Sequence, residues 1–261
     1  MNKLKNRITE LLERKEIDIF IGYEAGILRP RPLFVTRAQE VEKLVFNDSC
    51  TGNLAVYLTR KELKEGKRVG IWASWYTLKS IVQLFEENQL KEESLLIFYP
   101  RREEFVELSK LPEIREELKT ASPPSKTDNA ERIAELSQMS REQRWEFWSG
   151  ELSRCFKCYA CRAACPMCYC TQCIVEVNQP QWIHPWATTQ SNMEWQIARV
   201  MHMAGRCSDC GSCGSACPVG IPIHLLSHFL RESVAQNFGD PEEQGNVLSV
   251  FKPGDSENFI R

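Results

Sequence analysis

Two stretches, CFKCYACRAACP at residues 155–166 and CSDCGSCGSACP at residues 207–218, carry the same pattern of cysteines. Each reads C-x-x-C-x-x-C-x-x-x-C-P. Three thiolates so close in the chain can reach three irons of one cluster, while the last corner of that cluster must be met from elsewhere. The proline after the fourth cysteine bends the chain away and removes a backbone donor. The repeat therefore predicts two metal-binding runs of the same kind.

This pattern is typical of two-cluster ferredoxins, in which the first three cysteines of a run bind one [4Fe-4S] cluster and the fourth binds the other. The same crossing gives one cluster the ligands Cys155, Cys158, Cys161 and Cys217. It gives the other cluster the ligands Cys207, Cys210, Cys213 and Cys165. Zinc sites usually carry paired C-x-x-C units rather than triples, and a disulfide framework needs an exported chain, so both alternatives are weaker.

Four cysteines remain after these eight, namely Cys168, Cys170, Cys173 and Cys50. The first three follow the first run directly, whereas Cys50 lies far away in the N-terminal part. One interpretation is a third metal centre, a [4Fe-4S] cluster or a zinc ion, that uses all four thiolates. The alternative is that they pack as small hydrophobic side chains. Cys50 also stands at the start of an expected helix, where a reactive thiolate would be favoured, but an inert packing thiol is the simpler interpretation.

Residues 1–118 are expected to form a small α/β domain. Expected strands at 17–21, 33–35, 69–73 and 95–99 alternate with expected helices at 3–15, 36–44, 51–65 and 75–88. This alternation favours a mainly parallel sheet. The turn at residues 22–26 follows the first strand, where α/β proteins bind phosphate groups. It lacks the G-x-G-x-x-G fingerprint, so a bound flavin is not expected and a plain tight turn is preferred.

The chain changes character after residue 118. Residues 119–139, which include the sequence SPPS at 122–125, are expected to be a linker. Residues 140–236 show no strand pattern and are expected to form an all-helical [4Fe-4S] dicluster domain, with Met193, Ile197, Val200 and Met201 on the buried side of one helix. Residues 237–261 are expected to be a tail. The predicted fold class is thus α+β in two domains, a small N-terminal α/β domain followed by an all-helical, two-cluster ferredoxin-like domain.

Composition narrows the class of protein. A net charge of −2 shows no excess of positive charge, so nucleic acid is not an expected partner. No stretch has eighteen uninterrupted apolar residues, so no direct membrane span is expected. The charged start of the chain does not resemble a secretory signal. Twelve cysteines in a chain without an expected export signal indicate thiolates on metal in a reducing cytoplasm.

Two families are similar to this sequence. The segment from RWEFW at 144–148 through CFKCYACRAACPMCYC at 155–170, continued by GRCSDCGSCGSACPVGIP at 205–222, resembles the iron–sulfur subunit that accompanies the flavoprotein of heterodisulfide reductase. The N-terminal segments IGYE at 21–24, LVFN at 44–47 and NLAVYL at 53–58 more loosely resemble beta subunits of formate dehydrogenases and deazaflavin-reducing hydrogenases. The extra Cys168, Cys170 and Cys173 depart from the plain two-cluster pattern.

The resemblance implies an electron-transfer subunit rather than an enzyme in its own right. It would relay electrons between a flavoprotein of heterodisulfide reductase type and a dehydrogenase or hydrogenase, inside a cytoplasmic complex of an anaerobe. The expected cofactors are two [4Fe-4S] clusters, with the third centre as an addition. The alternative is a flavin- or deazaflavin-dependent oxidoreductase that uses the α/β domain, with the clusters as its electron supply.

Overall fold

The computed structural model describes residues 2–64, 66–102, 104–124 and 127–239. The chain divides into two compact units. The first comprises residues 1–125 together with Arg162–Tyr169, and the second comprises residues 126–161 and 170–261. Of the tail expected at residues 237–261, residues 240–261 lie outside the described residues, and Asn237 and Phe238 end a helix that begins at Ile223.

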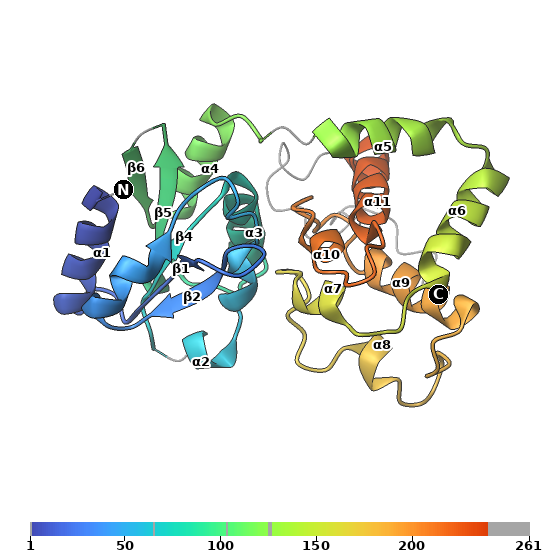
Figure 1. Ribbon diagram of the computed structural model, residues 1–261, viewed down its shortest axis with the longest axis horizontal. Helices are drawn as coiled ribbons and strands as arrows, with labels where there is room; N and C mark the ends of the chain where they lie inside the picture. The colour runs from blue at the N-terminus through green and yellow to red at the C-terminus, as the bar shows by residue number, and fades with distance from the viewer. Residues whose placement is uncertain (1, 65, 103, 125–126, 240–261) are drawn as a thin grey trace, which may run out of the picture. The chain divides into compact units, whose positions relative to one another are not determined.

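The first unit is a mixed sheet with helices on both faces (Figure 1). Its α-helices and strands are α1 (Asn2–Glu13), β1 (Ile19–Glu24), β2 (Arg31–Val35), β3 (Leu44–Val45), α2 (Lys61–Lys64), β4 (Val69–Trp72), α3 (Trp75–Glu86), β5 (Leu95–Arg101), β6 (Glu104–Leu108) and α4 (Leu111–Thr120). Short 3-10 helices lie at η1 (Ala38–Lys43), η2 (Leu54–Tyr57) and η3 (Glu92–Ser94). The strand order is β2-β1-β4-β5-β6, with β3 also paired to β1.

The sheet corrects the expectation of mainly parallel strands. Only the central strands β1, β4 and β5 run parallel, with Ile21 opposite Ile71 and Ile71 opposite Ile97. Strand β2 turns back on β1 and β6 turns back on β5, both antiparallel. For β6 the reason is the short connection, because only two residues separate it from β5 and parallel strands need a much longer crossover.

The helix expected over residues 51–65 is also wrong. The chain instead forms η2 and the single turn α2, separated by a short turn. Asn53 caps η2 by accepting a hydrogen bond from the Ala55 N–H, and its own amide donates to Ser80 Oγ over 2.8 Å. Because Asn53 is buried and bonded to α3, tertiary contacts override the helical propensity of the segment.

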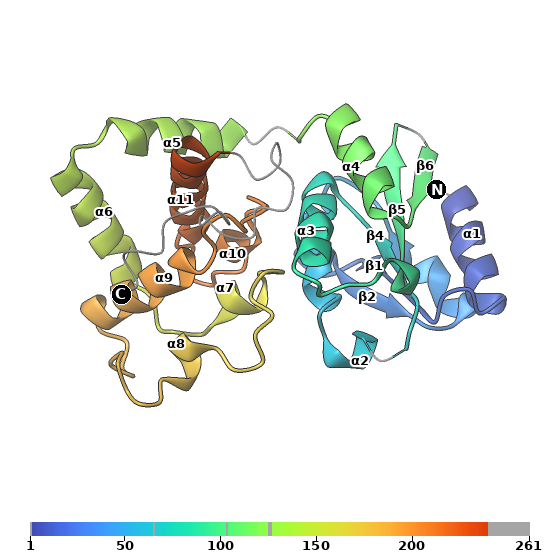
Figure 2. The same ribbon diagram turned by 180° about the vertical axis from the view of Figure 1, so that it is seen from behind.

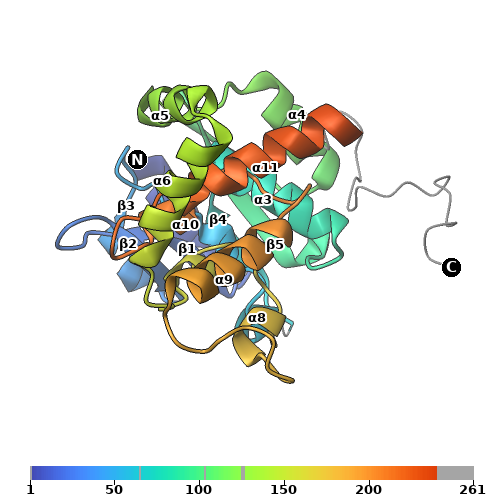
Figure 3. The ribbon, with the colours of Figure 1, turned by 90° about the vertical axis from the view of Figure 1, so that its right-hand side faces the viewer.

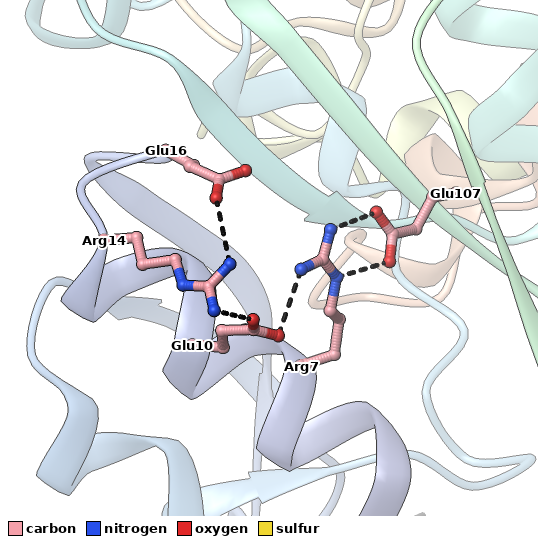
Figure 4. A network of polar contacts seen from close by, with 5 residues as sticks. All are labelled: Arg7, Glu10, Arg14, Glu16 and Glu107. Atoms are coloured by element: carbon pink, nitrogen blue, oxygen red, sulfur yellow. Dashed lines mark hydrogen bonds and ion pairs between the residues drawn. The ribbon is translucent and has the colours of Figure 1, made fainter.

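Helix α1 covers one face of the sheet, while α3 and α4 cover the other. Leu4, Ile8 and Leu11 of α1 pack against Phe20 and Phe98 in a fully buried cluster. At the edge, the guanidinium of Arg7 donates two hydrogen bonds to the carboxylate of Glu107 on β6, at 2.7 and 3.1 Å (Figure 4). These hydrogen bonds raise the pKa of Arg7. The paired bonds hold α1 in register with the edge strand.

The described residues of the second unit form helices and loops, with no strand among them. Its elements are α5 (Thr127–Gln138), α6 (Arg141–Ser153), α8 (Ile174–Val177), α9 (Thr189–Met201), α10 (Ser212–Ser215) and α11 (Ile223–Phe238), while the short helix α7 (Ala160–Ala163) lies across the boundary at residue 162. Helices α6, α8 and α11 all pack against α9 (Figures 2 and 3). The core of this unit, which includes Leu152, Val175, Trp195 and Ile223, adjoins the cysteine runs.

The segment 119–139, expected to be a linker, contains α5. The prolines at 123 and 124 lie before the helix rather than inside it. From Ala130 onward the segment is rich in Ala, Glu, Ile and Leu, which favour helix, and Leu136 is fully buried. The domain boundaries expected from the sequence stay predictions.

Candidate metal centre

Four cysteines line one pocket in the second unit. They are Cys155, Cys158, Cys161 and Cys217. Three come from the first cysteine run and one from the second, which is the set that the crossing pattern of two-cluster ferredoxins predicts. Cys217 lies 56 positions after Cys161 in the sequence. The structure therefore brings two distant parts of the chain to one pocket.

One side of this pocket is apolar and buried. Trp195, Ile221 and Ile223 line it and are 1–2% exposed. The ring of Trp195 meets the edge of Tyr159, with ring centroids 5.3 Å apart. Such walls exclude water, which influences the reduction potential of any cluster bound there.

The cysteines surround the pocket rather than meeting at a point. Among the described residues, no three His, Cys, Asp or Glu side chains stand close enough to hold a single metal ion. In a [4Fe-4S] cluster each thiolate binds a different iron, so its four sulfurs must be spread over the corners of a cube. Four cysteines around one pocket are a donor set that fits this group.

The backbone of each run donates to its first cysteine. In the first run the Lys157 N–H donates to Cys155 Sγ over 3.4 Å, and Lys157 has a φ of 55°. In the second run the Asp209 N–H donates to Cys207 Sγ over 3.4 Å, and Asp209 has a φ of 57°. Non-glycine residues seldom adopt this left-handed conformation, so its repetition marks a shared local fold.

The side chain of Lys157 is held by three oxygens at and just before the start of α9. Its ammonium donates to the carbonyl oxygens of His184 and Trp186 and to Ser191 Oγ. Burial lowers the pKa of Lys157, and the charges of Cys155 and Glu194 oppose that shift. The lysine thus ties the first cysteine run to the N-terminal end of α9.

Two further side chains of α9 anchor the first run, and sequence reasoning missed both. The Asn192 amide donates to the Leu152 and Cys155 carbonyl oxygens, at 3.0 and 2.6 Å. The Arg199 guanidinium donates to the Cys161 carbonyl oxygen over 3.0 Å. Asn192 is 0% and Arg199 is 3% exposed. Their spacing of seven residues, which places both on one helix face, is the signal that could have identified them.

The expected buried side of α9 is correct only in part. Met193 and Val200 are buried, but Ile197 is 47% and Met201 is 56% exposed. The face turned toward the cysteines carries Asn192, Gln196 and Arg199 instead. The buried side of α9 therefore combines part of the apolar stripe with polar side chains that hydrogen-bond to the first cysteine run.

The second run contains the short helix α10. Gly211 precedes α10 with a φ of 78°, and Cys213 and Gly214 lie inside it. A Cβ at Gly214 would stand 2.0 Å from His224 Nδ1, so glycine allows α11 to approach the run closely. Cys207, Cys210 and Cys213 belong to the second unit, and Cys165 lies in the Arg162–Tyr169 segment of the first. Their common role as ligands of one cluster stays a prediction.

The remaining cysteines are distributed over both units. Cys50 and Cys168 belong to the first, whereas Cys170 and Cys173 belong to the second. The Cys50 thiol donates to the Val45 carbonyl oxygen over 3.6 Å, and burial raises its pKa. A raised pKa disfavours the reactive thiolate that the start of a helix would have favoured, and Cys50 lies outside any helix. A third metal centre stays a prediction.

Comparisons with known proteins agree with this site. Residues 151–221 match the model of a family described as a 4Fe-4S dicluster domain, and the range contains all eight cysteines of the two runs. The chain is also similar to the F420-dependent formate dehydrogenase subunit beta of Methanocaldococcus jannaschii, with 33% identity over 76 residues. That stretch is 29% of this chain and 19% of the relative, so the chain spans less than a fifth of that protein.

The cysteine pattern, the pocket and the matched domain together define the class. The chain is an iron–sulfur protein that binds 4Fe-4S clusters through this region. Within residues 2–64, 66–102, 104–124 and 127–239, no helix has the length and apolar character needed to cross a membrane.

Proposed function

We propose that this protein is an electron-transfer subunit with two [4Fe-4S] clusters. Cys155, Cys158, Cys161 and Cys217 would hold one cluster, and Cys207, Cys210, Cys213 and Cys165 would hold the other. The protein would relay electrons between a flavoprotein of heterodisulfide reductase type and a dehydrogenase or hydrogenase partner. The observation that carries the proposal is the pocket at which cysteines of both runs meet.

Each part of the pocket has a role in this proposal. A bound cluster supplies one-electron transfer at low potential. The four thiolates hold it, while Trp195, Ile221 and Ile223 keep water away from it. Backbone N–H groups of Lys157 and Ile221 donate to the sulfurs of Cys155 and Cys217, at 3.4 and 3.3 Å. These donors stabilise negative charge on the thiolates.

The crossing of ligands favours electron transfer over a purely structural role. When a run gives its fourth cysteine to the neighbouring cluster, two clusters are held close together by a short length of chain. The similarity to a formate dehydrogenase beta subunit supports a place in a redox complex. Cys168, Cys170, Cys173 and Cys50 are left as the candidate ligands of a third centre.

Metal analysis of the full chain tests the number of centres. Protein purified without oxygen should contain about eight irons and about eight inorganic sulfides per chain, since each [4Fe-4S] cluster contributes four of each. About twelve irons would show a third cluster, and about eight irons with one zinc would show a zinc site. A colourless preparation without iron would refute the proposal.

A reductant experiment separates the relay from the enzyme alternative. F420, which occurs in the name of the formate dehydrogenase relative, is the reductant to use. Reduced F420 is mixed with the oxidised protein alone, and dithionite serves as the positive control. In an electron relay, dithionite should bleach the visible absorbance of the clusters and reduced F420 should not. In a deazaflavin-dependent enzyme, both reductants should bleach it. Flavin released on denaturation would also favour the enzyme.

A further inference from the structure

Gln196 points its amide at the cysteines of the pocket. It lies on α9, directly after the buried Trp195, and is 3% exposed. Its Nε2 lies 3.9 Å from Cys155 Sγ and 3.8 Å from Cys161 Sγ, and donates to both. Both cysteines belong to the set that lines the pocket, and Gln196 lines it too.

This placement is costly for the fold. Within the described part of the chain, the Oε1 atom of Gln196 is buried without a hydrogen-bond partner. An amide oxygen buried in this way loses its water and gains nothing in return, whereas a methionine of similar length would bury without loss. The benefit of an amide here must come from its N–H groups, which face the sulfurs.

Hydrogen bonds to the sulfurs of an iron–sulfur cluster influence its reduction potential. Reduction adds negative charge, and a donor aimed at the thiolates stabilises the reduced form more than the oxidised form. Inside a buried pocket this effect is stronger than in water, because the local dielectric is low. We propose that Gln196 raises the reduction potential of the cluster bound by Cys155, Cys158, Cys161 and Cys217.

Arg199 acts in the same direction. It lies three residues after Gln196 on the same helix face, and its guanidinium donates to the Cys161 carbonyl oxygen. A buried cation beside the first run favours the extra electron on Coulombic grounds. Gln196 and Arg199 therefore form one buried polar face of α9 that favours the reduced cluster.

This inference rests on the proposed function, because it needs a cluster in the pocket. The test is a redox titration of the full chain, followed by electron paramagnetic resonance (EPR) of the reduced clusters. The variant is Gln196→Met, which removes the donor and keeps the length of the side chain. Gln190→Met is the matched control, since Gln190 lies on the same helix, is exposed and donates to Glu194. A Cys158→Ala variant identifies which EPR component belongs to this pocket.

In Gln196→Met, the midpoint potential of that component should become more negative. At a fixed solution potential its reduced-to-oxidised ratio should fall by about tenfold, which equals about 59 mV for a one-electron couple. The other component, and both components of Gln190→Met, should not move.

Other outcomes overturn the inference. An unchanged midpoint in Gln196→Met, with full iron content, would show that the amide does not tune the cluster. Loss of this cluster from both Gln196→Met and Gln196→Leu would make Gln196 a structural residue, which also contradicts the inference. If the unmutated protein contains no cluster, the proposed function itself fails, so the two failures are distinguishable.

Discussion

Lys157 and Asp209 occupy the same place in the two cysteine runs but carry opposite charges. Each precedes the second cysteine of its run, has a left-handed φ and donates its N–H to the first cysteine over 3.4 Å. The backbone geometry is therefore repeated while the electrostatics are not. An ammonium beside the first run favours a reduced cluster. The Asp209 carboxylate beside the second run disfavours it, although the carboxylate also lies 3.3 Å from His228 Nδ1.

The charge of Asp209 should lower the potential of the second cluster. Replacing it in Asp209→Asn keeps the shape and the backbone donor but removes the negative charge, so that cluster should be reduced more easily. The expected shift is on the order of 60 mV, or about tenfold in the reduced-to-oxidised ratio. Redox titration followed by EPR measures it. Glu142→Gln, on the exposed start of α6, is the control, and an equal shift in both variants would contradict the local effect.

Single cysteine variants should separate the centres. Cys158→Ala removes one of the four thiolates of the pocket, so the protein should lose about four irons and one EPR component. Cys170→Ala leaves both predicted clusters with all their ligands and should retain about eight irons. Iron analysis and EPR on protein purified without oxygen provide the readout. If Cys158→Ala retained both components, the ligand assignment would be wrong.

Asn192 should be important for the stability of the second unit. Its amide satisfies two buried carbonyl oxygens, those of Leu152 and Cys155, and Asn192→Ala leaves both unpaired. We expect the free energy of unfolding to fall by about 1–3 kcal/mol, together with faster loss of the cluster. Denaturant unfolding without oxygen measures the first effect, and loss of visible absorbance measures the second.

Asn237→Ala is the matched control for this change. Asn237 is exposed on α11 and donates to the Ser233 carbonyl oxygen, so its replacement should change stability by no more than about 0.5 kcal/mol. Equal losses of unfolding free energy in Asn192→Ala and Asn237→Ala would show that burial beside the cysteine run does not determine the effect on stability.

The first unit should lose stability at alkaline pH through Tyr23. The Tyr23 hydroxyl donates to the Gly52 carbonyl oxygen, and burial raises the pKa of Tyr23 above its ordinary value of 10.0. Because the folded state retains this proton, the stabilisation is complete below pH 10 and is lost as the pH rises through the folded pKa. Unfolding midpoints measured across this range should decline with pH.

Tyr23→Phe should reduce this decline without abolishing it. Tyr57 and Tyr99 also have pKa values raised by burial, so part of the alkaline dependence should persist. The variant should also be less stable near neutral pH, since the hydrogen bond to Gly52 is lost. An unaltered slope above pH 10 would show that Tyr23 does not titrate with unfolding.

The cysteine spacing alone predicts the 4Fe-4S dicluster region, while the individual ligands stay a prediction. Ligand spacing is a local property of the chain, because three thiolates must reach neighbouring irons whatever the rest of the protein does. The matched dicluster domain at residues 151–221 agrees with that prediction. Strands β4 and β5 could also be predicted from the sequence, because each is a short apolar run, which is a local pattern too.

Only the tertiary structure decided which residues serve the pocket. Asn192, Gln196 and Arg199 are ordinary polar residues in the sequence, and their burial depends on how α9 turns toward Cys155 and Cys161. The same rotation leaves Ile197 and Met201 exposed although they are the more hydrophobic side chains. Likewise, the antiparallel pairing of β6 with β5 follows from a connection of only two residues, which the apolar pattern of the strands does not reveal. Spacing along the chain specifies which thiolates can share a metal, whereas burial and orientation arise from contacts between residues far apart in the sequence.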